Sequence, residues 1–250
     1  MSDEQNPFAP PQAELQSHTP STTDGGERSL EDAMAGKWSV SAGDIIKKAW
    51  DLKDGFKGVF IGATIIAGIA GGIASVISGL VTPDGAGQGL SFAISLVAGF
   101  IALPLTAPLQ AGLWRMQIKR AAGGSPEIGE MFQFYDRVVP IVLVSLITAL
   151  AVYIGILLLV IPGIYLSVAS YLALPLVVER GLAPMEAFQT SIKTIGNHWF
   201  DVFVLGLLAA VVGAGGFFLF GIGAIWTLPT FYIAAGCLYV EVFGWEDKGA

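Results

Sequence analysis

The sequence predicts an all-α polytopic membrane protein in which six transmembrane helices form three hairpins, each preceded by a cytoplasmic amphipathic helix at the membrane interface. Three observations lead to this prediction: the composition, the spacing of the apolar segments and the distribution of positive charge. Of 250 residues, 54% are hydrophobic and only 13% are charged, whereas soluble domains carry about 25% charged residues. Because so few charges cannot cover a surface that faces water, lipid must be part of the solvent.

The N-terminal residues 1–36 differ from the rest of the chain, because they are rich in Pro, Ser, Thr, Gln and acidic residues. Such a segment buries too little apolar surface to fold, so a disordered cytoplasmic tail is expected. The tail is either a solvated arm or a docking peptide built on the motif NPFAPP at residues 6–11. It carries most of the net charge of −7, so the acidity does not indicate a basic partner, and binding of nucleic acid is not expected.

Residues 37–246 form the predicted membrane domain, which contains six apolar segments. Most of them reach the roughly 20 residues that a spanning helix needs. They lack the period-2 alternation of strands, and only helices or closed barrels satisfy backbone polar groups in lipid, so helices are expected. The predicted spans are 58–81, 90–112, 139–161, 164–178, 200–220 and 223–241.

The positive charges predict the topology. All 13 Lys and Arg residues lie before the first span, in the connections 113–138 and 179–199, or after the last span. Lys and Arg concentrate in cytoplasmic loops, so both termini are predicted to be cytoplasmic. The connections that contain neither Lys nor Arg are predicted to lie outside, and they are 82–89, 162–163 and 221–223. In the second of them, Pro and Gly are expected to form the turn.

A short motif recurs in every second span. It reads ALPL in FIALPLTAPL (100–109) and YLALPLVVER (171–180), and TLPT in IWTLPTFYIA (225–234). The motif places Pro104, Pro175 and Pro229 in spans two, four and six.

A stretch with apolar residues at helical spacing precedes each pair of spans. These stretches are 41–56, 125–139 and 183–200. Each is predicted to form an amphipathic helix that lies in the inner interface or packs over the cytoplasmic end of the bundle. The repeat units are therefore about 41–122, 123–181 and 182–245.

Glu179 and Arg180 directly follow an apolar run at the end of the fourth span. One interpretation is that they mark the point where the chain leaves the membrane, since boundary charges anchor helices without taking part in chemistry. The alternative is a pair that contacts a substrate or gates a path at the inner end.

Catalytic, cofactor and metal sites are not expected. His198 and Asp201 can share a helix face, but no G-x-S-x-G elbow surrounds the serines that could serve as a nucleophile. Cys237 is the only cysteine and no metal-ligand spacing exists. No ionisable residue lies near the centre of a span, so proton- or ion-coupled transport is not indicated. An uncharged path through the proline-bearing spans remains open, with Gln110 among its polar side chains.

Two stretches resemble known families. NPFAPP before a polar tail resembles the start of many uncharacterised bacterial multipass membrane proteins. The stretch PGIYLSVASYLALPLVVERGLAPMEAFQTSIKTIGNHWF (162–200) resembles uncharacterised six-span inner-membrane proteins related to the membrane domain of glycerophosphodiester phosphodiesterase. The resemblance implies the fold, the topology and a bacterial inner membrane. It implies no catalytic residues, because the phosphodiesterase barrel is absent.

The leading functional hypothesis is a non-enzymatic accessory or scaffold protein of the inner membrane, which acts through membrane lipids, another membrane protein or a second copy of itself. The alternative is a permease or a transporter of lipids or small molecules that uses the proline-bearing spans, with Pro104, Gln110, Pro175, Glu179, Arg180 and Pro229 as candidate residues. An enzyme ranks third.

Overall fold

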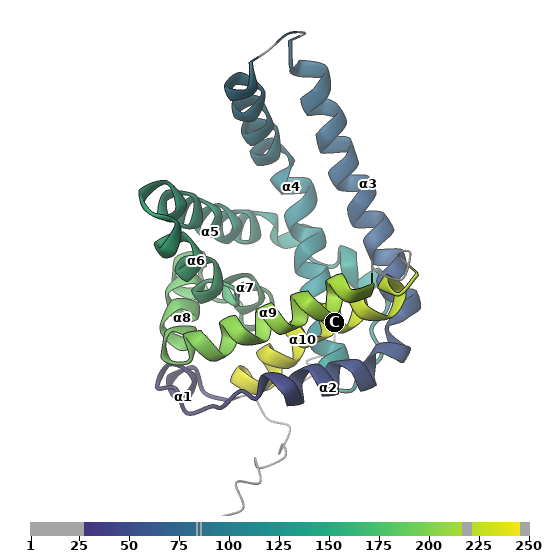
Figure 1. Cartoon of the computed structure of the whole chain (residues 1–250), viewed down its shortest axis with the longest axis vertical. Helices are drawn as coiled ribbons and strands as arrows, with labels where there is room; N and C mark the ends of the chain where they lie inside the picture. The colour runs from purple at the N-terminus through teal and green to yellow at the C-terminus, as the bar shows by residue number, and fades with distance from the viewer. Residues whose placement is uncertain (1–27, 84, 86, 217–221, 246–250) are drawn as a thin grey trace, which may run out of the picture.

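The computed structural model describes residues 28–83, 85, 87–216 and 222–245, and every regular element in these ranges is a helix (Figure 1). This confirms the predicted all-α class. The elements are α1 (Leu30–Met34), α2 (Ala42–Leu52), η1 (Lys53–Gly55), α3 (Lys57–Val81), α4 (Gln88–Ala121), η2 (Ile128–Phe132), η3 (Tyr135–Arg137), α5 (Val138–Leu158), α6 (Val160–Ala169), α7 (Ala173–Arg180), α8 (Pro184–Asn197), α9 (Trp199–Gly215) and α10 (Ala224–Phe243).

Five helical segments among the described residues are long and apolar enough to cross a membrane, and the bent pair α8–α9 would make a sixth if it counts as one span. The five are Lys57–Val81, Gln88–Ala121, Ile128–Leu158, Val160–Arg180 and Ala224–Phe243. Such lengths and hydropathy match the predicted membrane protein.

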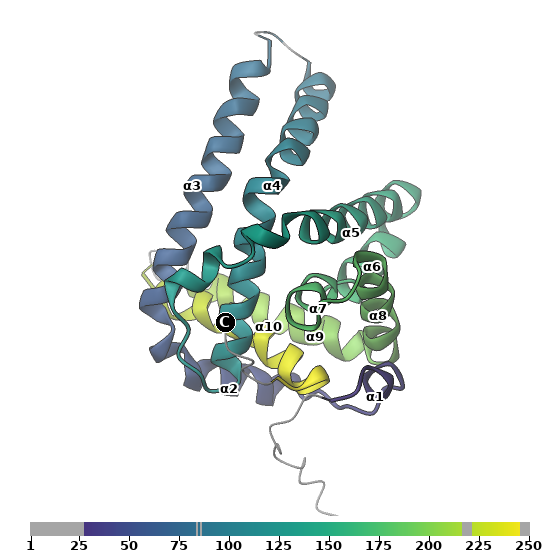
Figure 2. The ribbon, with the colours of Figure 1, turned by 180° about the vertical axis from the view of Figure 1, so that it is seen from behind.

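The helices α3 and α4 stand out from the rest of the molecule as a long pair (Figures 1 and 2). Most of their outer surface is apolar and uncovered: Leu80 is 83% exposed and Ile101 is 72% exposed. An apolar surface of this extent is unfavourable in water. Lipid or a protein partner must therefore cover it.

The second half of α4 forms the centre of the core. It is buried by η2 on one side and by α10 on another, and both approach it at a glycine. A Cβ on Gly112 would lie 2.4 Å from the Cα of Met131, and a Cβ on Gly236 of α10 would lie 2.4 Å from the carbonyl oxygen of Gln117. The backbones therefore touch at these two crossings.

Ordered structure begins closer to the N-terminus than the sequence predicts. Ser29 caps α1, Ala33 is buried, and the indole of Trp38 donates to the Ala33 carbonyl oxygen at 3.0 Å. The amide of Asn197 in α8 donates to the Met34 carbonyl oxygen at 2.8 Å. The prediction of a disordered tail is therefore wrong for residues 28–36, and residues 1–27 lie outside the described residues.

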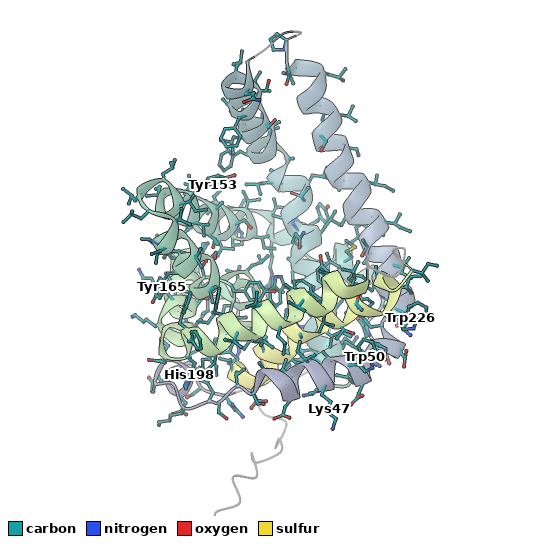
Figure 3. All side chains as sticks on the ribbon, viewed as in Figure 1. Lys47, Trp50, Tyr153, Tyr165, His198 and Trp226 are labelled. Carbon is teal, nitrogen blue, oxygen red and sulfur yellow. The ribbon has the colours of Figure 1, made fainter. Side chains whose placement is uncertain are left out.

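The first predicted amphipathic helix is confirmed as α2, although protein rather than lipid covers its apolar face. Ile45 and Ala49 are buried, and the helix packs against α9 and α10. Lys47 is exposed and points away from the body (Figure 3). The charged face of α2 thus forms part of the outer surface at the base of the molecule.

The second predicted amphipathic helix is wrong. Residues 125–139 form the two 3-10 turns η2 and η3, and α5 begins at Val138. Glu127 caps η2 through a reciprocal pair of hydrogen bonds with Glu130, and the backbone of Met131 lies directly on Gly112. Short 3-10 turns fit a connection that must follow the surface of a neighbouring helix.

The predicted turn at residues 162–163 is also displaced. The chain reverses at Leu159, whose backbone is extended, and Pro162 and Gly163 lie in the first turn of α6. Proline is tolerated there because the first N–H groups of a helix have no partner within it. Gly163 allows α6 to cross α5 at Gly155, where an added Cβ would meet the Gly163 backbone at 2.9 Å.

The helices α9 and α10 run across the base of α3 and α4 instead of alongside them (Figures 1 and 2). The axes of α8 and α9 differ by 93°. At the start of α10 the ring of Trp226 lies 5.2 Å from Nζ of Lys57, the first residue of α3. The turn before α10, which was predicted to lie outside the membrane, is therefore next to the start of α3, which was predicted to lie inside.

Candidate functional site

Four segments that are distant in the sequence meet at the base of the molecule, and we call their contact the inner junction. They are the second half of α4, the end of α7, the end of α10 with the residues that follow it, and the N-terminal segment. The inner junction consists of Arg28, Arg115, Glu179, Arg180, Glu241 and Trp245. It contains Glu179 and Arg180, two of the residues predicted as candidates.

Glu179 lies at the centre of the inner junction. Its Oε2 accepts from Nη1 of Arg115 at 2.7 Å and from the indole N–H of Trp245 at 2.7 Å. The Glu179 side chain is only 3% exposed and that of Arg115 is 15% exposed, and the guanidinium also lies 5.3 Å from the Trp245 ring. A charge that is removed from water requires such partners, because desolvation otherwise costs several kcal/mol.

Arg180 has a different set of partners from its neighbour. Its Nη2 donates to the carbonyl oxygens of Phe243 at 2.6 Å and of Arg28 at 3.1 Å. The last carbonyl oxygens of a helix accept no hydrogen bond from within the helix, and the negative end of the helix dipole favours a cation. Arg180 therefore caps α10 and ties it to the N-terminal segment.

Arg28 completes the contact between the two ends of the described chain. Its backbone N–H donates to the Phe243 carbonyl oxygen at 2.8 Å, and its guanidinium contacts both the carbonyl oxygen and the carboxylate of Glu241. The carboxylate lies 3.9 Å away. This pair is partly exposed, so it contributes less than the buried contact of Glu179.

Two further basic residues follow Arg115 near the end of α4. Lys119 contacts Glu130 of η2 at 2.6 Å. Arg120 donates to the carbonyl oxygens of Leu52 at 2.8 Å and Gly124 at 3.2 Å. Together with Arg115, they connect the end of α4 to α7, to η2 and to the end of α2. Sequence reasoning treated these residues only as topology signals and missed their structural role.

The other candidate residues are not brought together. Pro104 and Gln110 are exposed on α4, whereas Pro175 and Pro229 are buried in α7 and α10. None of the pockets described below is lined by these four residues or by Glu179 and Arg180. The pockets of the described residues therefore do not connect the six candidates.

Pro175 lies just after a break in the helix, between α6 and α7. A buried serine of α8 bridges this break: Ser191 Oγ accepts from the Leu172 N–H at 3.1 Å and donates to the Ala169 carbonyl oxygen at 2.7 Å. These bonds satisfy backbone groups that the break leaves open. Ser191 thus has a structural role, because it joins α8 to the break between α6 and α7.

His198 joins the N-terminal segment to the bend between α8 and α9 (Figure 3). Its Nε2 lies 3.1 Å from the Gly36 carbonyl oxygen, its Nδ1 lies 3.3 Å from Oδ2 of Asp201, and its ring packs on Trp38 at 4.5 Å. These contacts position the bend. Within the part of the chain that the structure describes, no three His, Cys, Asp or Glu residues are placed to hold a metal ion.

Comparisons with protein-family models, curated proteins and solved structures found no match for this chain. The resemblance of residues 162–200 to the six-span inner-membrane proteins therefore stays a prediction. The argument for a function depends on the geometry of the chain itself.

Proposed function

We propose that this protein is a non-enzymatic scaffold of the bacterial inner membrane, which holds a membrane partner against the hairpin α3–α4. The observation that carries this proposal is the uncovered apolar surface of the hairpin, next to a base that the inner junction holds together. Charged and aromatic side chains connect the two ends of the described residues at the base. The hairpin is the part that remains available for lipid, another membrane protein or a second copy.

The geometry offers less support to a permease built on the proline-bearing spans. Such a permease needs Pro104, Pro175 and Pro229 around a polar path. Pro104 lies on the exposed side of α4, and the polar Gln110 is also exposed on this helix. The buried Pro175 and Pro229 are packed into the core. A scaffold requires no such path.

The proposed topology has both termini in the cytoplasm, which the distribution of Lys and Arg supports. The sequence suggests six crossings in three hairpins. The contact between Lys57 and Trp226 supports a different placement of α9 and α10, along the inner side of the membrane. Burial agrees with this placement, since 56% of the most apolar stretch of α10 is buried, against 6% of the most apolar stretch of α4. A hairpin adds two crossings or none, so the C-terminus stays cytoplasmic in either case.

Cysteine labelling tests this placement. In a Cys237→Ala background, a cysteine at Ile222 is expected to react with a membrane-impermeant maleimide only after the inner membrane is opened, because the start of α10 lies beside the start of α3. A cysteine at Pro83, in the predicted outer loop, is the control and should react from outside. Labelling of both positions from outside would instead support six crossings.

The scaffold proposal is tested on the hairpin surface. Gly68 and Gly72 of α3 are exposed, and a Cβ at either position meets no atom within 4 Å. The double substitution Gly68→Leu, Gly72→Leu keeps the surface apolar but prevents close approach of another helix. We expect it to reduce cross-linking of the hairpin to its partner, or to a second copy, by about tenfold, which corresponds to about 1.4 kcal/mol of binding free energy.

The control for this experiment is Ile69→Leu, which changes the same surface without adding volume near the glycines. Both variants should fractionate with the membrane and unfold at the same temperature as the unchanged protein. Cross-linking that the double substitution leaves at full yield would overturn the scaffold proposal at this surface.

A further inference from the structure

Two neighbouring pockets share part of their lining, and they differ in chemistry. The first has a volume of about 420 Å³ and lies between α6, α9 and α10, with a lining that is almost entirely apolar, including Val202, Gly206 and Phe231. The second has a volume of about 390 Å³ and lies between α4, α5 and the α6–α7 break. Ser167 and Tyr171 line both pockets.

Hydroxyl groups concentrate in the second pocket. Ser145, Ser167 and Ser170 each donate to a carbonyl oxygen of their own helix, at 2.6–2.8 Å, so their oxygens can still accept a hydrogen bond. Among the described residues, the hydroxyls of Thr148 and Tyr171 have no hydrogen-bond partner. The Tyr171 ring is held edge-on against Trp114 at 5.2 Å between centroids. The pocket thus presents both donors and acceptors.

Charge is missing from both linings, as far as the described residues extend. A phosphate or carboxylate would lose its hydration here without gaining a cation, which is strongly unfavourable. An uncharged group that both donates and accepts, such as a hydroxyl beside an ester, would instead find partners. Most ligand pockets have volumes of about 300–1,000 Å³ and combine an apolar lining with a few polar groups.

We propose that these pockets bind one neutral acylglycerol lipid. One acyl chain lies in the apolar pocket between α6, α9 and α10, the free hydroxyl and ester lie in the hydroxyl-lined pocket near Thr148 and Tyr171, and any second acyl chain extends into the surrounding lipid. This proposal rests on the proposed membrane location, which supplies the lipid. It makes the scaffold a lipid-responsive one, because the ligand contacts α4, α9 and α10 at once.

The test uses the full chain in nanodiscs that contain either a diacylglycerol or a phosphatidylglycerol with a photoreactive group in one acyl chain. We expect diacylglycerol to cross-link within residues 202–210 and 231–238, to saturate, and to be competed by unlabelled diacylglycerol. Tyr171→Phe with Thr148→Val should reduce this labelling about fivefold to tenfold, as expected for one or two lost hydrogen bonds. Gly206→Leu should reduce it similarly by filling the apolar pocket.

The control is Gly99→Leu on the exposed side of α4. Like Gly206, Gly99 has no atom within 4 Å of an added Cβ, so both variants should fold. Equal labelling by the two lipids, or labelling that Gly206→Leu leaves unchanged, would overturn the lipid site. Absence of the chain from the membrane fraction would instead overturn the proposed location, so the two failures can be told apart.

Discussion

Glu179→Ala is expected to lower the free energy of unfolding by about 3–5 kcal/mol, the cost typical of removing one partner from a buried ion pair. The buried guanidinium of Arg115 would lose the carboxylate that holds it at 2.7 Å, and the indole of Trp245 would lose its acceptor. The end of α10 should then separate from α7. Thermal unfolding of the purified protein in detergent, followed by the fluorescence of its six tryptophans, measures the change in stability.

Glu186→Ala is the matched control, since Glu186 is an exposed glutamate in the first turn of α8. A change at such a surface position is usually within about 0.5 kcal/mol. The double variant Arg115→Met, Glu179→Leu should regain most of the lost stability, because apolar residues of similar volume can replace a buried ion pair. If Glu179→Ala and Glu186→Ala unfold at the same temperature, the inner junction does not stabilise the fold.

The helical class and most helix ends could be predicted because they depend on local sequence. The first predicted span, 58–81, differs from α3 by one residue at its start, and the last, 223–241, differs from α10 by one or two residues at its ends. In lipid only helices and closed barrels satisfy the backbone polar groups, and long apolar runs without period-2 alternation exclude barrel strands. No information about other segments is needed for this step.

The connections were predicted less well because tertiary contacts decide their form. Apolar residues at helical spacing in 125–139 suggested one amphipathic helix, but contact with Gly112 of α4 holds this segment in 3-10 turns. At residues 162–163 the proline and glycine suggested a turn, whereas Pro162 lies in the first turn of α6 and Gly163 allows α5 to approach closely. In each case the local sequence is compatible with two backbone structures, and a contact with a residue distant in the sequence determines which one forms.

The candidate site shows the same limit. Glu179 stands out in the sequence as a charge beside an apolar run, but its partner Arg115 is 64 residues away in the sequence. The recurring LP motif identified Pro104, Pro175 and Pro229 as equivalent, although one is exposed and two are buried. Similar local sequence reports a similar helix, and it carries no information about which face of that helix meets a neighbour.

The contact between α4 and η2 supports the second prediction of a large effect. A Cβ at Gly112 would lie 2.4 Å from the Cα and 2.5 Å from the carbonyl oxygen of Met131. Backbone atoms cannot rotate away as a flexible side chain can, so Gly112→Val must push η2 from α4. We expect it to lower the free energy of unfolding by at least about 1–3 kcal/mol, the usual cost of overpacking, and to disturb the contact of Lys119 with Glu130.

Gly99→Val supplies the matched control on the same helix. A Cβ at Gly99 meets no atom within 4 Å, and the two substitutions change helix propensity in the same way. Gly99→Val should therefore unfold at or above the temperature of the unchanged protein, while Gly112→Val unfolds earlier and becomes sensitive to proteolysis between residues 122 and 134. Equal unfolding temperatures for the two variants would show that η2 can move off α4 without cost, which the close backbone contact at Gly112 argues against.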